Sequence, residues 1–198
     1  MTKMILYKEW LKTRWFILGI LALLAGVTFY CFLNLTKVAE IRGGGIIWEA
    51  MVEKDAILLD ILRYVPAVCG VLLALSQFIP EIQHKRLKLT LHLPYSQTKM
   101  LLWMLGYGLV VLIAAFALEA LVSTLILGQW VPAELTGRIF RSSLVWYLAG
   151  CAAYLFTAAL CLEPTWRIRV LVLIVAAAFL RLLFVSEAPE AYNGFLPW

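Results

Sequence analysis

Two ionisable residues, Glu119 and Arg181, lie within long apolar stretches of the sequence and are the first candidates for a functional role. A charged side chain is costly in such a stretch, so where one occurs it commonly serves pairing, transport or ligand contact. Each residue lies in the second half of its stretch, which allows both to reach the same depth. We expect a carboxylate–guanidinium pair that locks two helices together. Extension of each side chain to a polar surface, or contact with a substrate, are the alternatives.

No group of side chains has the spacing of a catalytic or metal centre. His84 and His92 are the two histidines, and no HxxxH, DxxxD or Ser/His/Asp set accompanies them. The sequence has no GxxxxGK[ST] loop, which binds the phosphates of ATP. The four cysteines show no CxxC spacing and read as buried apolar side chains: Cys31, Cys69, Cys151 and Cys161. We predict no catalytic residue, metal or cofactor in this chain, which argues against an enzyme acting on lipid.

The composition predicts an all-α membrane protein. Apolar residues make up 64% of the chain and charged residues 15%, with a mean hydropathy of +0.91. Crossing the hydrocarbon takes about 20 apolar residues in a helix, because every backbone amide there must be bonded within its own segment. Five segments meet this requirement, and we expect them to form one transmembrane domain over 1–198. They are residues 15–35, 57–80, 100–127, 144–162 and 167–185.

The distribution of charge predicts which side each loop faces. With a cytoplasmic N-terminus, ten of the 17 basic residues but three of the 12 acidic ones fall in cytoplasmic segments. Lysine and arginine collect there in membrane proteins. Five spans then leave the acidic tail, 186–198, on the outer side. The net charge of +5 reflects anchoring near anionic lipid, and no basic patch with nucleic-acid spacing is present.

The first 14 residues have the pattern of an amphipathic helix that lies in the inner membrane interface. Its aromatic residues would lie at headgroup level, and its lysines, Lys8 and Lys12, would approach lipid phosphate. The interfacial residues would be Tyr7, Lys8, Trp10, Leu11 and Arg14. An ordinary basic flank that only orients the first span is the alternative.

Residues 81–96 form a charged segment between two apolar stretches, and we expect a short cytoplasmic helix there. Leucines alternate with polar residues, which by itself is a strand pattern, but the composition favours a helix with two opposed leucine faces. Pro94 would end this helix, and Ser96 could cap the next one. Such a helix is suited to contact the bilayer on one side and a partner protein on the other.

The chain resembles the permease subunits of ABC-2 type ABC transporters over about residues 1–105. In that family the second span leads into a Glu, then basic residues, then a leucine-rich turn that ends in Leu-Pro and a small hydroxyl residue. The same order occurs here, and LYKEWLKTRW resembles the family's opening helix. The Gly-Thr pair that follows the basic residues in the family is replaced by Leu87-Lys88, and the family has six spans where five are counted here.

The resemblance implies that the chain moves a substrate, in the export direction, while a separate nucleotide-binding subunit binds ATP and Mg and hydrolyses the ATP. A second permease subunit and the bilayer would be the other partners, in a bacterial cytoplasmic membrane. The resemblance implies docking of the ATPase at residues 81–96. The docking residues would be Glu81, Lys85, Arg86, Leu87, Leu89, Leu93, Pro94, Tyr95 and Ser96.

Two other functions fit the sequence. The chain has the size and the alanine-rich helix faces of a small membrane-embedded component that binds substrate for an importer. A polytopic membrane scaffold without transport activity is the other alternative. The substrate itself cannot be read from the sequence, because no group of polar residues specifies one.

Overall fold

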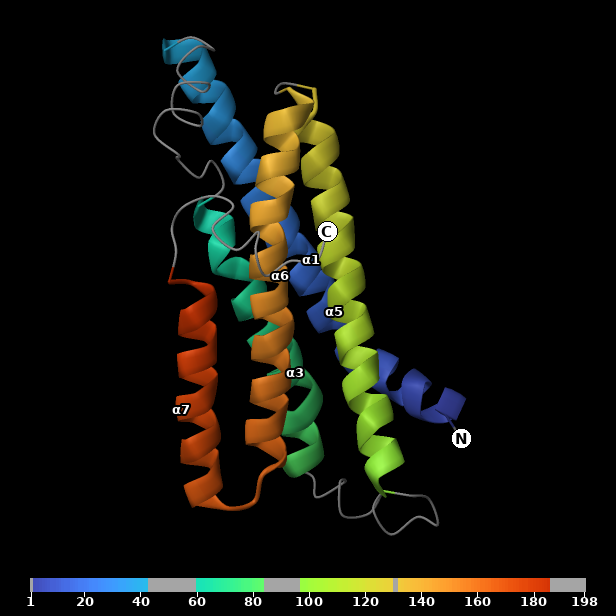
Figure 1. Cartoon of the computed structure of the whole chain (residues 1–198). Helices are drawn as coiled ribbons and strands as arrows, with labels where there is room; N and C mark the ends of the chain where they lie inside the picture. The colour runs from blue at the N-terminus through green and yellow to red at the C-terminus, as the bar shows by residue number, and fades with distance from the viewer. Residues whose placement is uncertain (1, 43–59, 84–96, 130–131, 186–198) are drawn as a thin grey trace.

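The computed structural model describes residues 2–42, 60–83, 97–129 and 132–185, and within these ranges the chain is all-helical. The prediction of an all-α protein is confirmed for this part of the chain. Five helices and one short 3-10 helix make up the bundle (Figure 1). They are α1 (Thr2–Arg42), η1 (Asp60–Arg63), α3 (Val65–Gln83), α5 (Gln97–Leu127), α6 (Ala133–Leu162) and α7 (Trp166–Leu183).

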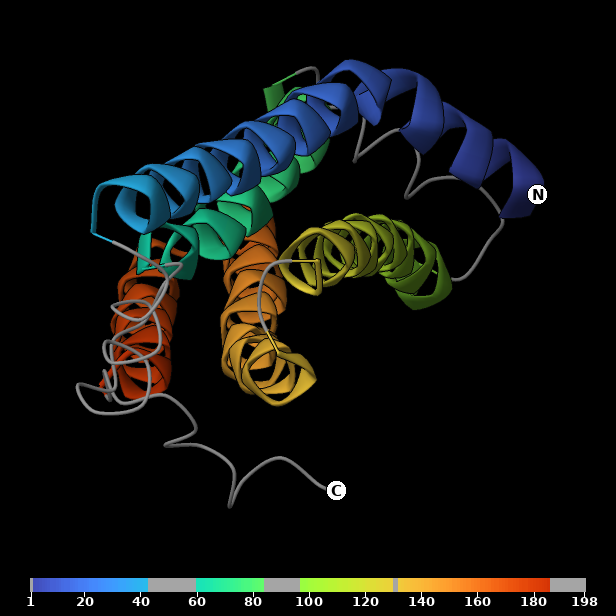
Figure 2. The same cartoon turned by 90° about the horizontal axis from the view of Figure 1, so that it is seen from above.

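Successive helices run in alternating directions along the bundle. Figure 1 shows the start of α1, the end of α3, the start of α5 and the α6–α7 turn at one end of the molecule. We call this end the N-terminal end. The first turns of α1 bend away from the line of the rest of the helix (Figures 1 and 2). Seen from above, α3 lies between α1 and α6, while α5 and α7 lie on opposite sides of α6 (Figure 2).

Four helices of the described chain are long and apolar enough to cross a membrane: Lys3–Asn34, Val65–Ile82, Thr98–Leu127 and Thr136–Leu162. Large apolar side chains remain exposed along them, as expected of a multi-pass membrane protein whose helices face lipid. The predicted fifth span forms a helix, α7, of 18 residues. It is not among the four, and it carries Arg167, Arg169 and Arg181.

Two predicted boundaries were wrong. The second span was expected from residue 57, but its helix begins at Val65, after the 3-10 turn. Pro66 explains this start, because proline is well tolerated in the first turn of a helix, where its missing N–H is not needed. The fourth was expected from residue 144, but α6 begins at Ala133, directly after Pro132. Its first turns carry charge and extend the helix beyond its apolar stretch.

The tightest packing in the bundle is the crossing of α3 and α6 at two glycines. A Cβ atom on Gly70 would lie 2.1 Å from the carbonyl oxygen of Gly150. A Cβ atom on Gly150 would lie 2.7 Å from the carbonyl oxygen of Pro66 and 2.8 Å from the Phe116 ring. Small residues let two backbones approach in this way, so α3 and α6 pack closely at this crossing.

Candidate functional site

The polar side of the N-terminal segment faces the bundle, and its apolar side faces outward. Glu9 and Thr13 are fully buried, whereas Tyr7, Trp10 and Leu11 are half exposed or more. Arg14 is exposed as well, with its guanidinium over the ring of Trp15. The outward apolar side suits contact with lipid. The expectation that the lysines approach lipid phosphate was wrong for Lys12, whose side chain is only 15% exposed.

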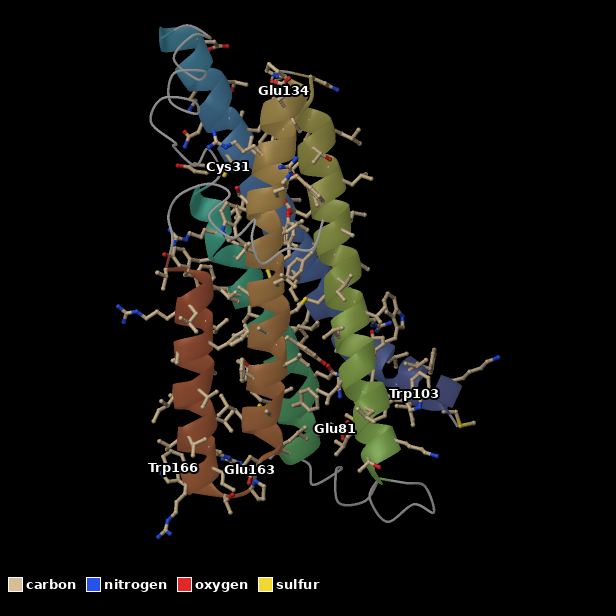
Figure 3. The ribbon with its side chains drawn as sticks, in the orientation of Figure 1. Cys31, Glu81, Trp103, Glu134, Glu163 and Trp166 are labelled. Atoms are coloured by element: carbon tan, nitrogen blue, oxygen red, sulfur yellow. The ribbon has the colours of Figure 1, made fainter. Side chains whose placement is uncertain are left out.

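Four charged residues form a buried cluster at the N-terminal end, which we call the ionic junction: Lys8, Glu9, Lys12 and Glu81. The ammonium nitrogen of Lys8 lies 2.8 Å from Oε1 of Glu81. That of Lys12 lies 3.3 Å from the same oxygen and 2.9 Å from Oε2 of Glu9. Glu81 lies at the end of α3 (Figure 3) and is 1% exposed. The two carboxylates and two ammonium groups balance in charge, as buried ions must.

At the ionic junction, Glu81 is bound by side chains of α1 in the same chain. Its Oε1 accepts both lysines, while its Oε2 is buried and has no hydrogen-bond partner among the described residues. Of the residues predicted to dock an ATPase, Glu81 is the one that the structure describes. The others, from Lys85 to Ser96, lie outside the described residues.

Hydroxyl and amide groups continue the polar contacts from the ionic junction into the bundle. The hydroxyl of Thr13 donates to the carbonyl of Glu9 at 2.8 Å and lies 3.0 Å from the hydroxyl of Tyr107 on α5. A threonine hydroxyl carries one proton. Since that proton is used on the carbonyl of Glu9, Tyr107 is the donor to Thr13. This bond joins α1 to α5 at the residue directly after Lys12.

Gln77 and Tyr154 join α3, α5 and α6 at a second buried contact. The amide nitrogen of Gln77 donates to the carbonyl of Met104 at 2.8 Å, and its amide oxygen accepts from the hydroxyl of Tyr154 at 2.9 Å. Both side chains are fully buried. Gly108 provides the space, because a Cβ atom there would lie 2.1 Å from the Tyr154 hydroxyl. The spans are therefore held together by specific polar bonds as well as by apolar packing.

Glu119 lies at a third polar contact, between α1, α5 and α6. Its Oε1 is 3.0 Å from the hydroxyl of Thr28 on α1, and its Oε2 accepts from the hydroxyl of Tyr147 on α6. The residue is 4% exposed. The Tyr147 ring stacks on Phe116, with centroids 5.2 Å apart. Glu119 therefore joins three helices through hydroxyl groups.

The predicted ion pair between Glu119 and Arg181 was wrong. The ion pairs of the ionic junction involve neither residue. Glu119 is engaged by Thr28 and Tyr147, while Arg181 is exposed. The physical reason is the placement of α7, which packs on α6 on the side opposite α5. Equal depth in the bundle does not bring two helices into contact.

Several residues of these contacts were not singled out from the sequence. They are Glu9, Thr13, Thr28, Gln77, Tyr107, Tyr147 and Tyr154. One signal could have found Gln77, since an amide in the middle of an apolar span needs a partner inside the protein. The tyrosines carry no such signal, because tyrosine is also common at membrane interfaces.

The described residues contain no group of three His, Cys, Asp or Glu side chains that could hold a metal ion. Comparison with family models, with curated proteins and with solved structures finds no match for this chain. What can be inferred about function therefore rests on the three polar contacts and on the order of residues along the sequence.

Proposed function

We propose that the chain is the transmembrane subunit of an ATP-driven transporter of the ABC-2 type, acting in export. A separate subunit would bind ATP and Mg, hydrolyse the ATP and dock on residues 81–96. A second permease subunit would complete the transporter, which we assign to a bacterial cytoplasmic membrane with the N-terminus inside. The observation that carries the proposal is the ionic junction, because it connects the start of the docking segment to α1, which is bonded in turn to α5 through Thr13 and Tyr107.

The ionic junction can transmit a displacement of the docking segment to the spans. Residues 84–96 connect the end of α3 directly to the start of α5. Glu81 binds Lys8 and Lys12 of α1 two residues before α3 ends, and Thr13 of α1 is bonded to Tyr107 of α5. A push on the segment would therefore act on α1, α3 and α5 together. Rigid helices joined in this way move as a unit, as a power stroke requires.

The apolar character of the outer surface of α5 and α7 indicates what covers it in a membrane. Apolar side chains on the outer sides of α5 and α7 are exposed in the single chain, among them Leu118, Leu121, Leu171 and Ile174. In a membrane such a surface is covered by lipid or by another apolar helix. We propose that lipid covers most of it and a second permease subunit covers the rest.

Reversing the charges of the docking segment should release the ATPase. With Lys85→Glu and Arg86→Glu together, we expect the ATPase recovered with the tagged chain from detergent-solubilised native membranes to fall roughly tenfold or more, which corresponds to about 1.4 kcal/mol. Mass spectrometry would identify the ATPase by its phosphate-binding loop. Arg167→Glu is the matched control, since Arg167 is exposed at the start of α7, at the same end of the bundle. Equal recovery with both variants would contradict docking at this segment.

Reporter fusions can test the proposed topology and the role of α7. A reporter active only in the cytoplasm, joined after Glu163, should be active, whereas the same reporter joined after Val185 should be inactive. The two sites lie on either side of α7, so the difference reports whether this helix crosses the membrane. Activity at both sites would mean that α7 does not cross and that the fifth span is absent.

A further inference from the structure

The carboxyl group of Glu119 is buried, and the described residues place no cation beside it. The lysines of the ionic junction, Lys8 and Lys12, lie several turns before Thr28 along α1 and pair with Glu9 and Glu81. The titratable groups that face Glu119 are the Tyr147 phenol from α6 and the Cys31 thiol from α1, and neither is a cation in any protonation state. A carboxylate without a counter-charge is strongly disfavoured in apolar surroundings.

Three contacts around Glu119 share the two protons that the hydroxyl groups of Thr28 and Tyr147 supply. Thr28 lies 2.9 Å from the carbonyl oxygen of Leu24, which can only accept, and 3.0 Å from Oε1 of Glu119. The single proton of Thr28 forms one full hydrogen bond. With that proton on the Leu24 carbonyl, the bond to Glu119 needs a proton on Oε1. Tyr147 supplies its own proton to Oε2.

We propose that Glu119 is a proton-binding site, occupied in this conformation, that joins α1, α5 and α6 as a neutral carboxylic acid. The bonds then run in one direction, from Tyr147 to Glu119 to Thr28 to the Leu24 carbonyl, and every short contact has one donor and one acceptor. The proton comes from water and returns to water. Its release leaves a charge between the three helices that no cation among the described residues balances, and it turns the Thr28 hydroxyl from acceptor to donor toward Glu119. The inference concerns the bundle itself and does not depend on the proposed function.

Infrared difference spectroscopy on the full chain in lipid vesicles tests this site directly. At neutral pH the wild-type chain should show the carbonyl band of a protonated carboxylic acid, and Glu119→Gln should lose it. Glutamine is suited to keep the fold, because its amide can donate to Thr28 and its oxygen can accept from Tyr147. The band should fade as the pH is raised. Tyr147→Phe should shift it to higher frequency, because the carbonyl oxygen loses its donor.

Glu81→Gln provides the matched control, since Glu81 is equally buried but lies beside two lysines. This variant should lose a carboxylate band and leave the carboxylic acid band unchanged. A wild-type spectrum without a carboxylic acid band at neutral pH, or a band that persists in Glu119→Gln, would overturn the proposal. Either result can be read without knowing a substrate or a partner.

Discussion

Replacing Lys12 by methionine should lower the free energy of unfolding by about 3–5 kcal/mol, the cost of leaving a buried charge without its partner. Lys12 is the cation beside Glu9, at 2.9 Å from one carboxylate oxygen and 3.1 Å from the other. Glu9 is fully buried, so loss of the ammonium group would leave its carboxylate without a counter-charge. Methionine keeps the length of the side chain, so the loss measures charge more than volume. Unfolding in mixed micelles with increasing dodecyl sulfate, followed by tryptophan fluorescence, would measure it.

Lys8→Met is the matched control for this prediction. The side chain of Lys8 is 41% exposed, and its partner Glu81 keeps Lys12 at 3.3 Å when Lys8 is removed. An exposed ion pair contributes less than about 1 kcal/mol. The double variant Lys12→Met with Glu9→Gln should recover much of the stability, because it removes both charges. If Lys12→Met is no more harmful than Lys8→Met, the cluster does not hold the N-terminal segment.

Replacing Gly70 by alanine should destabilise the bundle by about 3 kcal/mol, at the upper end of the usual cost of overpacking. The new methyl group would meet the backbone oxygen of Gly150 at 2.1 Å and the backbone nitrogen of Tyr154 at 3.1 Å. Backbone atoms cannot turn away as a flexible side chain can, so α3 and α6 would have to separate. The same unfolding experiment in mixed micelles measures the loss.

Gly106→Ala gives a control of opposite sign. Gly106 lies within α5, and a Cβ atom there would meet nothing within 4 Å. Alanine in the interior of a helix is more stable than glycine by about 0.5–1 kcal/mol. We therefore expect Gly106→Ala to be slightly more stable than the wild-type chain. A similar small gain for Gly70→Ala would show that α3 and α6 are not in close contact at this crossing.

The helices could be predicted from the sequence, but several of their ends could not. Apolar runs identify spans because hydrocarbon requires internal backbone bonding, and four of the five predicted spans match helices able to cross. A helix, however, does not end where its hydropathy falls. The first turns of α6 continue through Glu134, Arg138 and Arg141, which are good or neutral helix formers and can be solvated. Hydropathy marks the apolar stretch and leaves the length of the helix open.

The sequence indicates that some polar residues need a partner inside the bundle, but it does not indicate which residues those partners are. Glu119 stood out from the sequence because a carboxyl in an apolar segment needs a partner, but its partners are hydroxyl groups on α1 and α6. The pattern of residues 1–14 showed two faces, yet it could not show that Glu81 on α3 would draw the polar face inward. Periodicity describes one helix at a time. Which helices become neighbours depends on packing, such as the glycine crossing of α3 and α6.

The ionic junction also bears on the order of events when the chain enters the membrane. Lys8 and Lys12 emerge from the ribosome long before Glu81, from which Lys12 is separated by 69 positions. During insertion of the first helix the two lysines are therefore free positive charges, and in the proposed topology they would help to hold the N-terminus in the cytoplasm. Once α3 is in place, the same charges are neutralised inside the protein. Loss of Lys12 therefore affects both orientation during synthesis and stability afterwards, whereas loss of Glu81 affects only the second.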